Sequence, residues 1–407
     1  MQKALLLIIF FVAHFATAQT NADDEKLRKL ADKLAHQYII TDGHVDLPYR
    51  LRVKHFRLER QYLDIPISSK EGDFDYLRAK KGGLSAPFMS IYIPASYQIT
   101  GGAKALADSL IDMVTGIAKA HPDKFRVAKT PAEVDANFQK GLISLPMGME
   151  NGAPIGELAD VAYFKKRGIS YITLTHGKDN KICDSSYDTT RTHQGLSAYG
   201  REVVKEMNKV GVMVDISHVS DDTFFQVMKM TDVPCIASHS SCRKFTPTFK
   251  RNMSDEMIKL LGQKGGVIQI NFSTLFLDDA KRIVFEAKEK ELAKLLEAKG
   301  IKEHTPEAEV LTKTFQQQNP VLLSDVETVA DHIDNVVKLT GGTNNVGFGS
   351  DFDGVGDSLP TGLKDVSQYP NLIFALLKRG YSPQDIEKIC YKNVWRVWRQ
   401  VLMATKK

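Results

Sequence analysis

The stretch Thr41-Asp42-Gly43-His44-Val45-Asp46-Leu47-Pro48 follows a short apolar run, residues 37–40, that we expect to be a β-strand. Side chains two positions apart on a strand point to the same side, so His44 and Asp46 should project together. An imidazole and a carboxylate at the point where a buried strand opens into a loop form half of a metal site. They could equally be a histidine and an acid that pair with each other. The rest of the chain decides between these interpretations.

Seven further apolar, β-prone runs follow, and segments with helical periodicity separate them. The runs span residues 85–93, 142–147, 169–175, 212–217, 233–238, 266–271 and 346–350. Together with the first strand they make eight, the number that closes a (β/α)8 or TIM barrel, so we predict an α/β fold of that type. An open, doubly wound sheet is the competing architecture. No G-x-G-x-x-G turn follows the first strand, which argues against a dinucleotide-binding domain.

The N-terminus has the pattern of a secretory signal peptide. Lys3 is followed by an apolar run over residues 4–15 and by the small-residue motif Ala16-Thr17-Ala18. We therefore expect residues 1–18 to be a signal peptide, residues 19–407 to form a single barrel domain, and the protein to be periplasmic or secreted. The apolar run is short for a membrane span, and neither end of the chain carries a lipid-anchor signal.

Composition excludes some classes of protein and leaves other questions open. Of 407 residues, 43% are hydrophobic and 25% charged, as in ordinary globular proteins. The net charge of +5 is small and its basic residues are dispersed, so no nucleic-acid partner is indicated. The oligomeric state stays open, with a homodimer as one option. Four cysteines do not determine a disulfide pattern: Cys183, Cys235, Cys242 and Cys390.

Two segments exceed what a minimal barrel needs. Residues 50–75 predict a long polar loop after the first strand. Residues 275–319, rich in Lys and Glu, predict a charged helical insertion after the seventh strand that could overhang the mouth of the barrel. Helices are also expected over residues 22–37 and 382–401, the second as a closing helix that begins at a cap signal.

Imidazoles and carboxylates stand at the ends of six predicted strands. They are His44 and Asp46 after the first strand, Glu150 after the third, His176 after the fourth, His218 after the fifth, His239 after the sixth and Asp351 after the eighth. In a barrel these ends converge on one mouth. Singly, each residue has a structural explanation, and Asp353 remains as well explained by turn chemistry as by a site. Collectively they are costly to bury unless they bind a cation or transfer protons.

The ligand set predicts the number of ions. Three histidines, an aspartate and a glutamate exceed the needs of one tetrahedral zinc. They suit two divalent ions bridged by a carboxylate and a water, which would supply a hydroxide nucleophile. The sequence contains no G-x-S-x-G motif and no cysteine in a catalytic context, so a covalent route is not indicated.

Six motifs in order along nearly the whole mature chain resemble the membrane (renal-type) dipeptidase family. They are Asp42-Gly43-His44-Val45-Asp46, Gly148-Met149-Glu150-Asn151-Gly152, Leu174-Thr175-His176, residues 214–220, Ser238-His239-Ser240-Ser241 and residues 349–355. The resemblance implies a (β/α)8 metallopeptidase of the amidohydrolase kind, with two zinc ions, that acts on dipeptides. It implies that His44 and Asp46 bind one zinc, that His218 and His239 bind the other, and that Glu150 bridges them.

The resemblance also implies roles around the metals. His176 is similar to the family's substrate-binding histidine, which hydrogen-bonds the oxyanion. Asp351 matches the acid/base residue, which contacts the substrate and passes a proton to the leaving amine. Arg251 resembles the arginine that binds the substrate carboxylate, although this match crosses a variable loop and a surface arginine is the alternative. The animal members' lipid anchor and disulfide-linked dimer have no counterpart in the motifs.

The leading hypothesis is a secreted dinuclear zinc dipeptidase. An amidohydrolase that acts on another small amide, such as an N-acyl amino acid or a lactam, would use the same residues. A non-catalytic binding barrel would require a missing ligand or acid/base residue, and none is missing. Side-chain preference and the native metal stay open, since histidine and carboxylate ligands also accept manganese, cobalt or iron.

Overall fold

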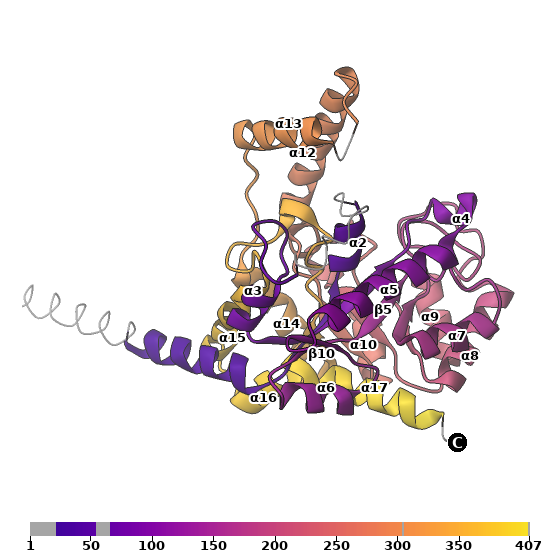
Figure 1. Ribbon diagram of the computed structural model, residues 1–407, viewed down its shortest axis with the longest axis horizontal. Helices are drawn as coiled ribbons and strands as arrows, with labels where there is room; N and C mark the ends of the chain where they lie inside the picture. The colour runs from indigo at the N-terminus through magenta and orange to yellow at the C-terminus, as the bar shows by residue number, and fades with distance from the viewer. Residues whose placement is uncertain (1–21, 54–65, 303–304, 406–407) are drawn as a thin grey trace, which may run out of the picture.

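Eight parallel strands form a closed barrel at the centre of the molecule (Figure 1). The computed structural model describes residues 22–53, 66–302 and 305–405. The strands follow one another around the barrel in chain order, and β1 pairs with both β2 and β10 to close it. They are β1 (Ile40–Val45), β2 (Leu84–Tyr92), β5 (Met147–Glu150), β6 (Ile169–Thr173), β7 (Met213–Asp215), β8 (Ile236–Ser240), β9 (Val267–Ile270) and β10 (Val346–Phe348). The predicted (β/α)8 fold is confirmed.

Two of the predicted strands differ most from those in the structure. The first strand begins at Ile40, because residues 22–37 are helical, and His44 therefore lies inside it. The predicted strand over residues 142–147 is in fact two strands. β4 (Ile143–Leu145) pairs with β3 (Phe125–Val127) in a separate small sheet, whereas β5 enters the barrel. Pro146 lies between β4 and β5 and has no N–H to donate, so a single ladder cannot continue through it.

Helices surround the barrel, and side-chain caps fix where many of them begin. Ser197, Ser220 and Ser254 each accept a hydrogen bond from a backbone N–H in the first turn of the helix that follows. The helices are α2 (Leu47–Val53), α3 (Tyr76–Gly82), α4 (Tyr97–Thr100), α5 (Ala103–Ala120), α6 (Pro131–Phe138), α7 (Ala159–Arg167), α8 (Ala198–Val210), α9 (Asp221–Met230), α10 (Asp255–Gln263), α14 (Val326–Thr340) and α15 (Tyr369–Lys378). None of the helices in the described part of the chain has the length and apolarity needed to cross a bilayer.

The C-terminal helices cover the base of the barrel. α16 (Pro383–Glu387) begins with a capping box between Ser382 and Asp385, and a short π-helix, η6 (Lys388–Lys392), joins it to α17 (Asn393–Ala404). Trp395 and Trp398 are fully buried there, and the Trp395 indole N–H donates to Thr41 Oγ1 at 3.0 Å. The predicted closing helix is therefore present, interrupted by one π-helical turn.

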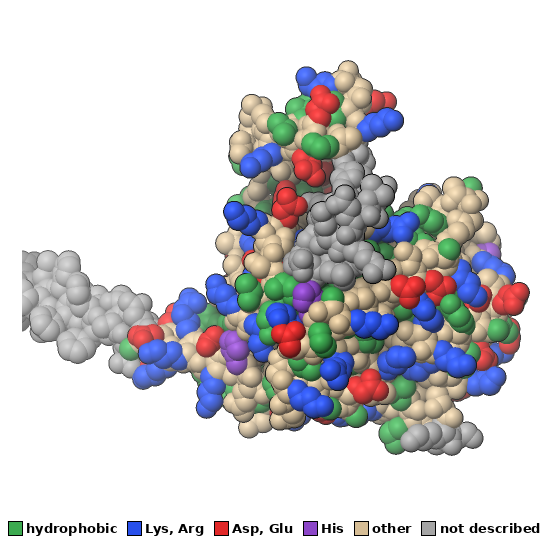
Figure 2. All heavy atoms as spheres, in the orientation of Figure 1, with side chains coloured by type: hydrophobic (Ala, Val, Ile, Leu, Met, Phe, Trp, Pro, Cys, Tyr) green, Lys and Arg blue, Asp and Glu red, His purple; other side chains and the backbone are tan. Residues whose placement is uncertain are grey.

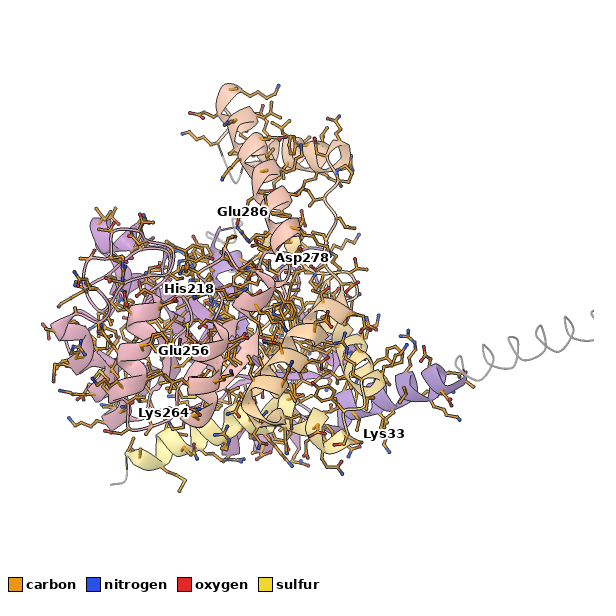
Figure 3. All side chains as sticks on the ribbon, turned by 180° about the vertical axis from the view of Figure 1, so that it is seen from behind. Lys33, His218, Glu256, Lys264, Asp278 and Glu286 are labelled. Atoms are coloured by element: carbon orange, nitrogen blue, oxygen red, sulfur yellow. The ribbon has the colours of Figure 1, made fainter. Side chains whose placement is uncertain are left out.

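The opposite end of the barrel is the mouth, where the strand carboxyl ends open into loops. Figure 3 shows His218 at this end, below Asp278 and Glu286, with Lys264 at the other end. The segment after β9 forms α11 (Thr274–Leu277), α12 (Asp279–Ala298) and α13 (Pro306–Gln318). We call α12 and α13 the arm, because they project from the mouth side (Figures 1 and 2). The predicted charged helical insertion is thus confirmed.

The remaining predictions about this chain have mixed outcomes. Residues 50–75 are not one loop, because Arg50 lies in α2; residues 54–65 fall outside the described part, as does the predicted signal peptide. All four cysteines are buried free thiols, so no disulfide joins the described residues.

Candidate active site

Glu150, the last residue of β5, lies at the centre of a buried polar cluster at the mouth. Its Oε1 atom lies 3.0 Å from Nε2 of His218 and 3.3 Å from Nε2 of His239. Its Oε2 atom lies 3.3 Å from Nε2 of His44 and accepts a hydrogen bond of 3.4 Å from Ser90. Because its two oxygens face imidazoles from three different strand ends, Glu150 has the position that a bridging carboxylate requires.

β1 and the residue that directly follows it supply a histidine and a carboxylate. Nε2 of His44 lies 3.3 Å from Oδ2 of Asp46, so the two side chains do project to the same side. The backbone N–H of His44 donates to the buried carboxylate of Asp42 at 2.9 Å, which fixes the chain at this point. The pair is therefore part of a larger cluster and not an isolated ion pair.

β7 and β8 bring two further histidines against each other. The Nε2 atoms of His218 and His239 lie 2.8 Å apart, and both side chains are buried. Burial holds the pKa of each imidazole well below its ordinary value. Neutral imidazoles have a lone pair available, which is the form that ligates metals.

The donor chemistry of the cluster fits divalent cations. Burial opposes ionisation of Glu150, but the imidazoles around it outweigh burial and hold its pKa well below the ordinary value. Burial also opposes protonation of His44, yet Tyr171 and the nearby carboxylates raise its pKa well above the ordinary value. The cluster therefore stabilises positive charge near Nε2 of His44. That atom has no hydrogen-bond partner among the described residues.

Three overlapping groups of side chains could each hold an ion. Within each group the potential ligand atoms lie within 4.8 Å of one another. The groups are His44, Glu150 and His239; Glu150, His176 and His218; and His44, Asp46 and Asp351. All five predicted ligands are thus brought together, but the geometry does not divide them into the two predicted pairs.

Asp351 follows β10 and faces the same cluster. Its Oδ1 atom lies 4.0 Å from Nε2 of His44, and its Oδ2 atom accepts a 2.8 Å hydrogen bond from Asn271. Asn271 is itself oriented, because its Oδ1 accepts from the Ser273 N–H at 2.8 Å. Burial, together with the charges of Asp46 and Glu150, raises the pKa of Asp351 to about 7. A carboxyl group with that pKa can both accept and release a proton near neutral pH.

His176 follows β6 and is the most exposed of the four histidines, with 24% of its side chain accessible. Its Nε2 atom lies 3.6 Å from Oε1 of Glu150, and its ring stacks edge-on against Tyr92. Burial lowers its pKa, so the ring is neutral at pH 7 and carries one N–H donor. Its accessibility suits contact with a substrate, although it also belongs to one of the three candidate ion groups.

Arg251 is buried beside the cluster, only 3% exposed, and is not the surface arginine that was the alternative. Its guanidinium donates to Ser240 Oγ at 2.6 Å and to the His239 carbonyl at 2.8 Å, and it lies over the ring of Phe276. Among the residues that the structure describes, no carboxylate pairs with it, and its Nε has no partner. A buried guanidinium without a counter-charge favours an anionic ligand.

Several cluster residues have a backbone conformation that L-residues rarely adopt. His218 has φ of 68° and Asp351 has φ of 65°, and Asn151, directly after Glu150, has φ of 75°. Such a residue costs of the order of 1–3 kcal/mol, and the cost is tolerated where the surroundings hold the side chain in place. Strain at three strand ends around one cluster marks it as the functional part of the barrel.

Two residues that the sequence motifs did not indicate support the cluster. Asn271 ends the seventh predicted strand, so the strand-end pattern could have included it. Tyr171 lies inside β6, and its hydroxyl lies 3.0 Å from Nδ1 of His44; no motif pointed to it. Asp353 is more than a turn residue, since it accepts from the Asp73 N–H at 2.6 Å and lies 3.2 Å from the Arg50 guanidinium.

Comparison with known proteins places the chain among peptidases. Residues 28–407 match the family model described as membrane dipeptidase, peptidase family M19. An uncharacterised dipeptidase of Schizosaccharomyces pombe is 30% identical over 384 residues, which cover 91% of this chain and 83% of the relative.

Solved structures show the same fold. The probable dipeptidase PvdM of Pseudomonas aeruginosa superposes with a TM-score of 0.76 at 23% identity, covering 93% of this chain and 99% of that chain. A metallopeptidase of Rhodobacter sphaeroides, determined with a phosphinate mimic of the dipeptide L-Ala-D-Ala, has a TM-score of 0.72 at 23% identity. That match covers 89% of this chain and 99% of the other.

Proposed function

The chain belongs to the membrane dipeptidase family of metallopeptidases, and from this we propose that it cleaves dipeptides at the mouth cluster with two divalent metal ions, most readily Zn²⁺. The observation that carries the proposal is the buried guanidinium of Arg251, which has no carboxylate partner among the described residues and donates to the backbone carbonyl of His239, one of the histidines around Glu150. This juxtaposition supplies an anchor for a C-terminal carboxylate within reach of a hydrolytic centre. The phosphinate dipeptide mimic bound by the Rhodobacter relative supports the same substrate class.

We assign His44, Asp46, His218 and His239 as the residues that would hold the metal ions, and Glu150 as the carboxylate that would be shared between them. When bound, the ions would lower the pKa of a shared water toward neutrality and so supply the nucleophile. Zinc suits the imidazole-rich donor set, and the carboxylates complete it. The buried setting strengthens the electrostatic interactions among these groups.

Asp351 is the proton carrier in this proposal. With a pKa raised to about 7, its carboxylate accepts a proton from water as attack on the peptide carbonyl proceeds. The same group then delivers that proton to the nitrogen of the leaving amine, which departs as a neutral amine. Asn271 holds Oδ2 by a hydrogen bond and leaves Oδ1 on the side that faces His44.

His176 and Arg251 bind the substrate. The neutral His176 ring would donate its N–H to the oxygen that becomes negative in the tetrahedral intermediate. Arg251 would pair with the substrate's terminal carboxylate, and its contacts with Ser240 and the His239 carbonyl hold the guanidinium in place for that purpose. A fixed distance between the two residues would restrict the enzyme to short substrates with a free C-terminus.

A substrate panel tests the function. Metal-loaded protein should hydrolyse dipeptides and leave the matched tripeptides and C-terminally amidated dipeptides nearly untouched, and chelation should abolish the activity. Faster turnover of N-acyl amino acids or lactams than of dipeptides would favour the alternative amidohydrolase. No turnover of any dipeptide with metal present would refute the proposal.

We further propose that the protein is exported. The support is the charged, apolar and small-residue pattern over residues 1–18. Mass spectrometry of the protein from its native host should show an N-terminus at Gln19 or close to it. An intact Met1 on the mature protein would contradict export by this route.

A further inference from the structure

The hydroxyl of Tyr171 lies between His44 and the backbone of β1. Tyr171 is fully buried inside β6, and its Oη atom lies 3.0 Å from Nδ1 of His44. The other ring nitrogen, Nε2, is the one that faces Asp46 and Glu150 at 3.3 Å each. The hydroxyl therefore touches His44 on the side away from the cluster.

The direction of the hydrogen bonds follows from the single proton of the hydroxyl. Tyr171 donates to the carbonyl oxygen of Gly43 at 2.9 Å, a bond that only the tyrosine proton can make. Toward His44 the hydroxyl must then act as acceptor, so Nδ1 of His44 carries a hydrogen. A neutral His44 with hydrogen on Nδ1 has its lone pair on Nε2, directed at the carboxylates.

The neighbouring strand leaves room for this contact. A Cβ atom at Gly148 would lie 1.9 Å from Cζ of Tyr171, so any other residue there would displace the ring. Gly148 lies on β5 two residues before Glu150, and the ring of Phe88 packs against that of Tyr171 with 5.4 Å between centroids. β5 therefore carries Glu150 and also, through Gly148, leaves space for the tyrosine that contacts His44.

His239, whose ring centroid lies 3.9 Å from that of His44, has a similar arrangement. Its Nδ1 atom lies 2.7 Å from Oγ of Ser238, and that hydroxyl lies 2.7 Å from Oδ2 of Asp215. Asp215 also accepts from the backbone N–H groups of Ser217 and Ser238. Because a carboxylate can only accept, Ser238 donates to Asp215 and accepts from His239, which again leaves the lone pair on Nε2.

We propose that Tyr171 and Ser238 are positioning residues that hold His44 and His239 in the tautomer that presents Nε2 to a metal ion. The inference rests on the proposed function only in treating the two histidines as ligands. A residue that accepts from the far nitrogen of a ligating histidine fixes the ring and its tautomer, and its loss commonly weakens metal binding by about 10–100-fold. A purely packing role for Tyr171 would need the ring but not the hydroxyl, so Tyr171→Phe separates the two explanations.

The test compares Tyr171→Phe with Tyr199→Phe in the Zn²⁺-loaded full-length protein. Tyr199 also donates to a carbonyl, that of Ile155 at 3.2 Å, but lies away from the cluster. The first readout is Zn²⁺ affinity, measured by competition with a chromophoric chelator. We expect Tyr171→Phe to weaken it by about 10–100-fold and Tyr199→Phe to leave it within about two-fold.

The second readout is spectroscopic and does not depend on turnover. With ¹⁵N-labelled histidine, the Nδ1–H proton of His44 should give a downfield resonance, assigned by its loss in His44→Gln. In Tyr171→Phe that resonance should move upfield or broaden by exchange, while the resonance of His239 stays in place. Ser238→Ala should show the converse, and it serves as the test should Tyr171→Phe not fold.

Unchanged Zn²⁺ affinity with an unchanged His44 resonance in Tyr171→Phe would overturn the proposal. Failure of the proposed function is distinguishable, because wild-type protein that binds Zn²⁺ but cleaves no dipeptide would leave both readouts intact.

Discussion

The mouth cluster and the arm both contain many charged residues, but these are buried at the mouth and exposed to solvent on the arm. At the mouth, Glu150 is buried among imidazoles, and His218 has a strained backbone. On the arm, pairs such as Lys288 and Glu291 are one turn apart and remain 33% and 54% exposed. Exposed pairs contribute little to stability or function, whereas buried charge is retained only where something compensates for it. Burial, and not the number of charges, distinguishes the working region.

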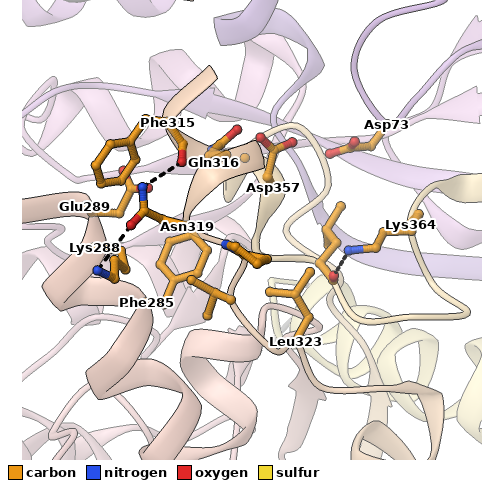
Figure 4. A pocket seen from close by; sticks show the side chains of 14 residues that line it. Asp73, Phe285, Lys288, Glu289, Phe315, Gln316, Asn319, Leu323, Asp357 and Lys364 are labelled. Atoms are coloured by element: carbon orange, nitrogen blue, oxygen red, sulfur yellow. Dashed lines mark hydrogen bonds between the residues drawn. The ribbon is translucent and has the colours of Figure 1, made fainter. Parts of the chain in front are cut away.

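The base of the arm is loosely packed as well. A cavity of about 430 Å³ lies there between Phe285 and Phe315 on the arm and Lys364 near the barrel (Figure 4). Lys288, at its edge, already donates to Asn319 at 3.5 Å. The hydrophobic core of the arm is small: among the described residues its buried members are Leu292, Leu296 and Ala308. We therefore expect the arm to tolerate changes that the mouth does not.

The contrast can be tested by making the same substitution, Glu→Gln, in both regions. Glu150→Gln removes a buried negative charge that faces three imidazoles, so metal affinity and dipeptide turnover should both fall, turnover by at least about a thousand-fold. Glu291→Gln on the arm should leave both within about two-fold of wild type. Metal content by mass spectrometry and kcat/KM measure the two effects. Comparable losses of metal affinity and turnover in the two variants would show that burial of the charge does not decide its importance for function.

Asp351→Asn should separate catalysis from metal binding within the mouth itself. The amide preserves the shape of the side chain but cannot carry a proton, so kcat should fall by about 10²–10⁴-fold while bound metal stays at the wild-type level. Asp331→Asn, at a site 52% exposed on α14, is the matched control. An Asp351→Asn enzyme with normal turnover would exclude the acid/base role.

The pH dependence of the free energy of unfolding should reveal the buried carboxyl pair of Asp73 and Asp353, which lies next to the mouth. Burial raises the pKa of Asp73 to about 7 and of Asp353 to about 6. Between pH 4 and these values the folded state holds protons that the unfolded chain has lost. Stability should therefore fall as pH rises through this window, by at most about 1.4 kcal/mol per pH unit for each group.

Asp73→Asn should flatten that slope, because the amide does not titrate. Chemical denaturation of the metal-free protein between pH 4 and 8 measures it, with Asp331→Asn as a control whose curve should run parallel to wild type. Parallel curves for wild type and Asp73→Asn would show that Asp73 titrates as an ordinary carboxyl group.

The smallest effect is expected on the arm. Leu296→Ala should open the contact between α12 and α13, so that amide hydrogen exchange of those helices rises while kcat/KM stays within about two-fold. Leu110→Ala, which empties a fully buried position on α5, should instead cost about 2–5 kcal/mol of global stability. A large loss of activity in Leu296→Ala would mean that the arm participates in the reaction.

The sequence predicted the barrel and the gathering of its histidines because both depend on local pattern. Strand ends are readable from apolar runs, and parallel strands in a barrel bring their ends together. Boundaries were less readable: Pro146 splits one predicted strand, and the helix over residues 22–37 shifts the start of another. Both signals are local, but each lies within or against an apolar run that reads as a continuous strand, so the run alone places the boundary wrongly.

The roles of Tyr171 and Asp353 could not be predicted, because they depend on contacts between distant parts of the chain. Tyr171 reaches His44 only because Gly148, on a different strand, has no side chain. Asp353 pairs with Asp73, which lies 280 positions away in the chain. Such contacts follow from the three-dimensional arrangement of strands and loops, so the roles of these two residues emerge only from the structure.

One measurement tests the central claim most directly: titration of chelated protein with Zn²⁺ while dipeptide hydrolysis is recorded. If the mouth cluster holds two ions with Glu150 between them, activity should rise with added metal and reach its plateau at about two equivalents per chain. Glu150→Gln should give no comparable plateau. Full activity at one equivalent, or in the absence of metal, would contradict the account.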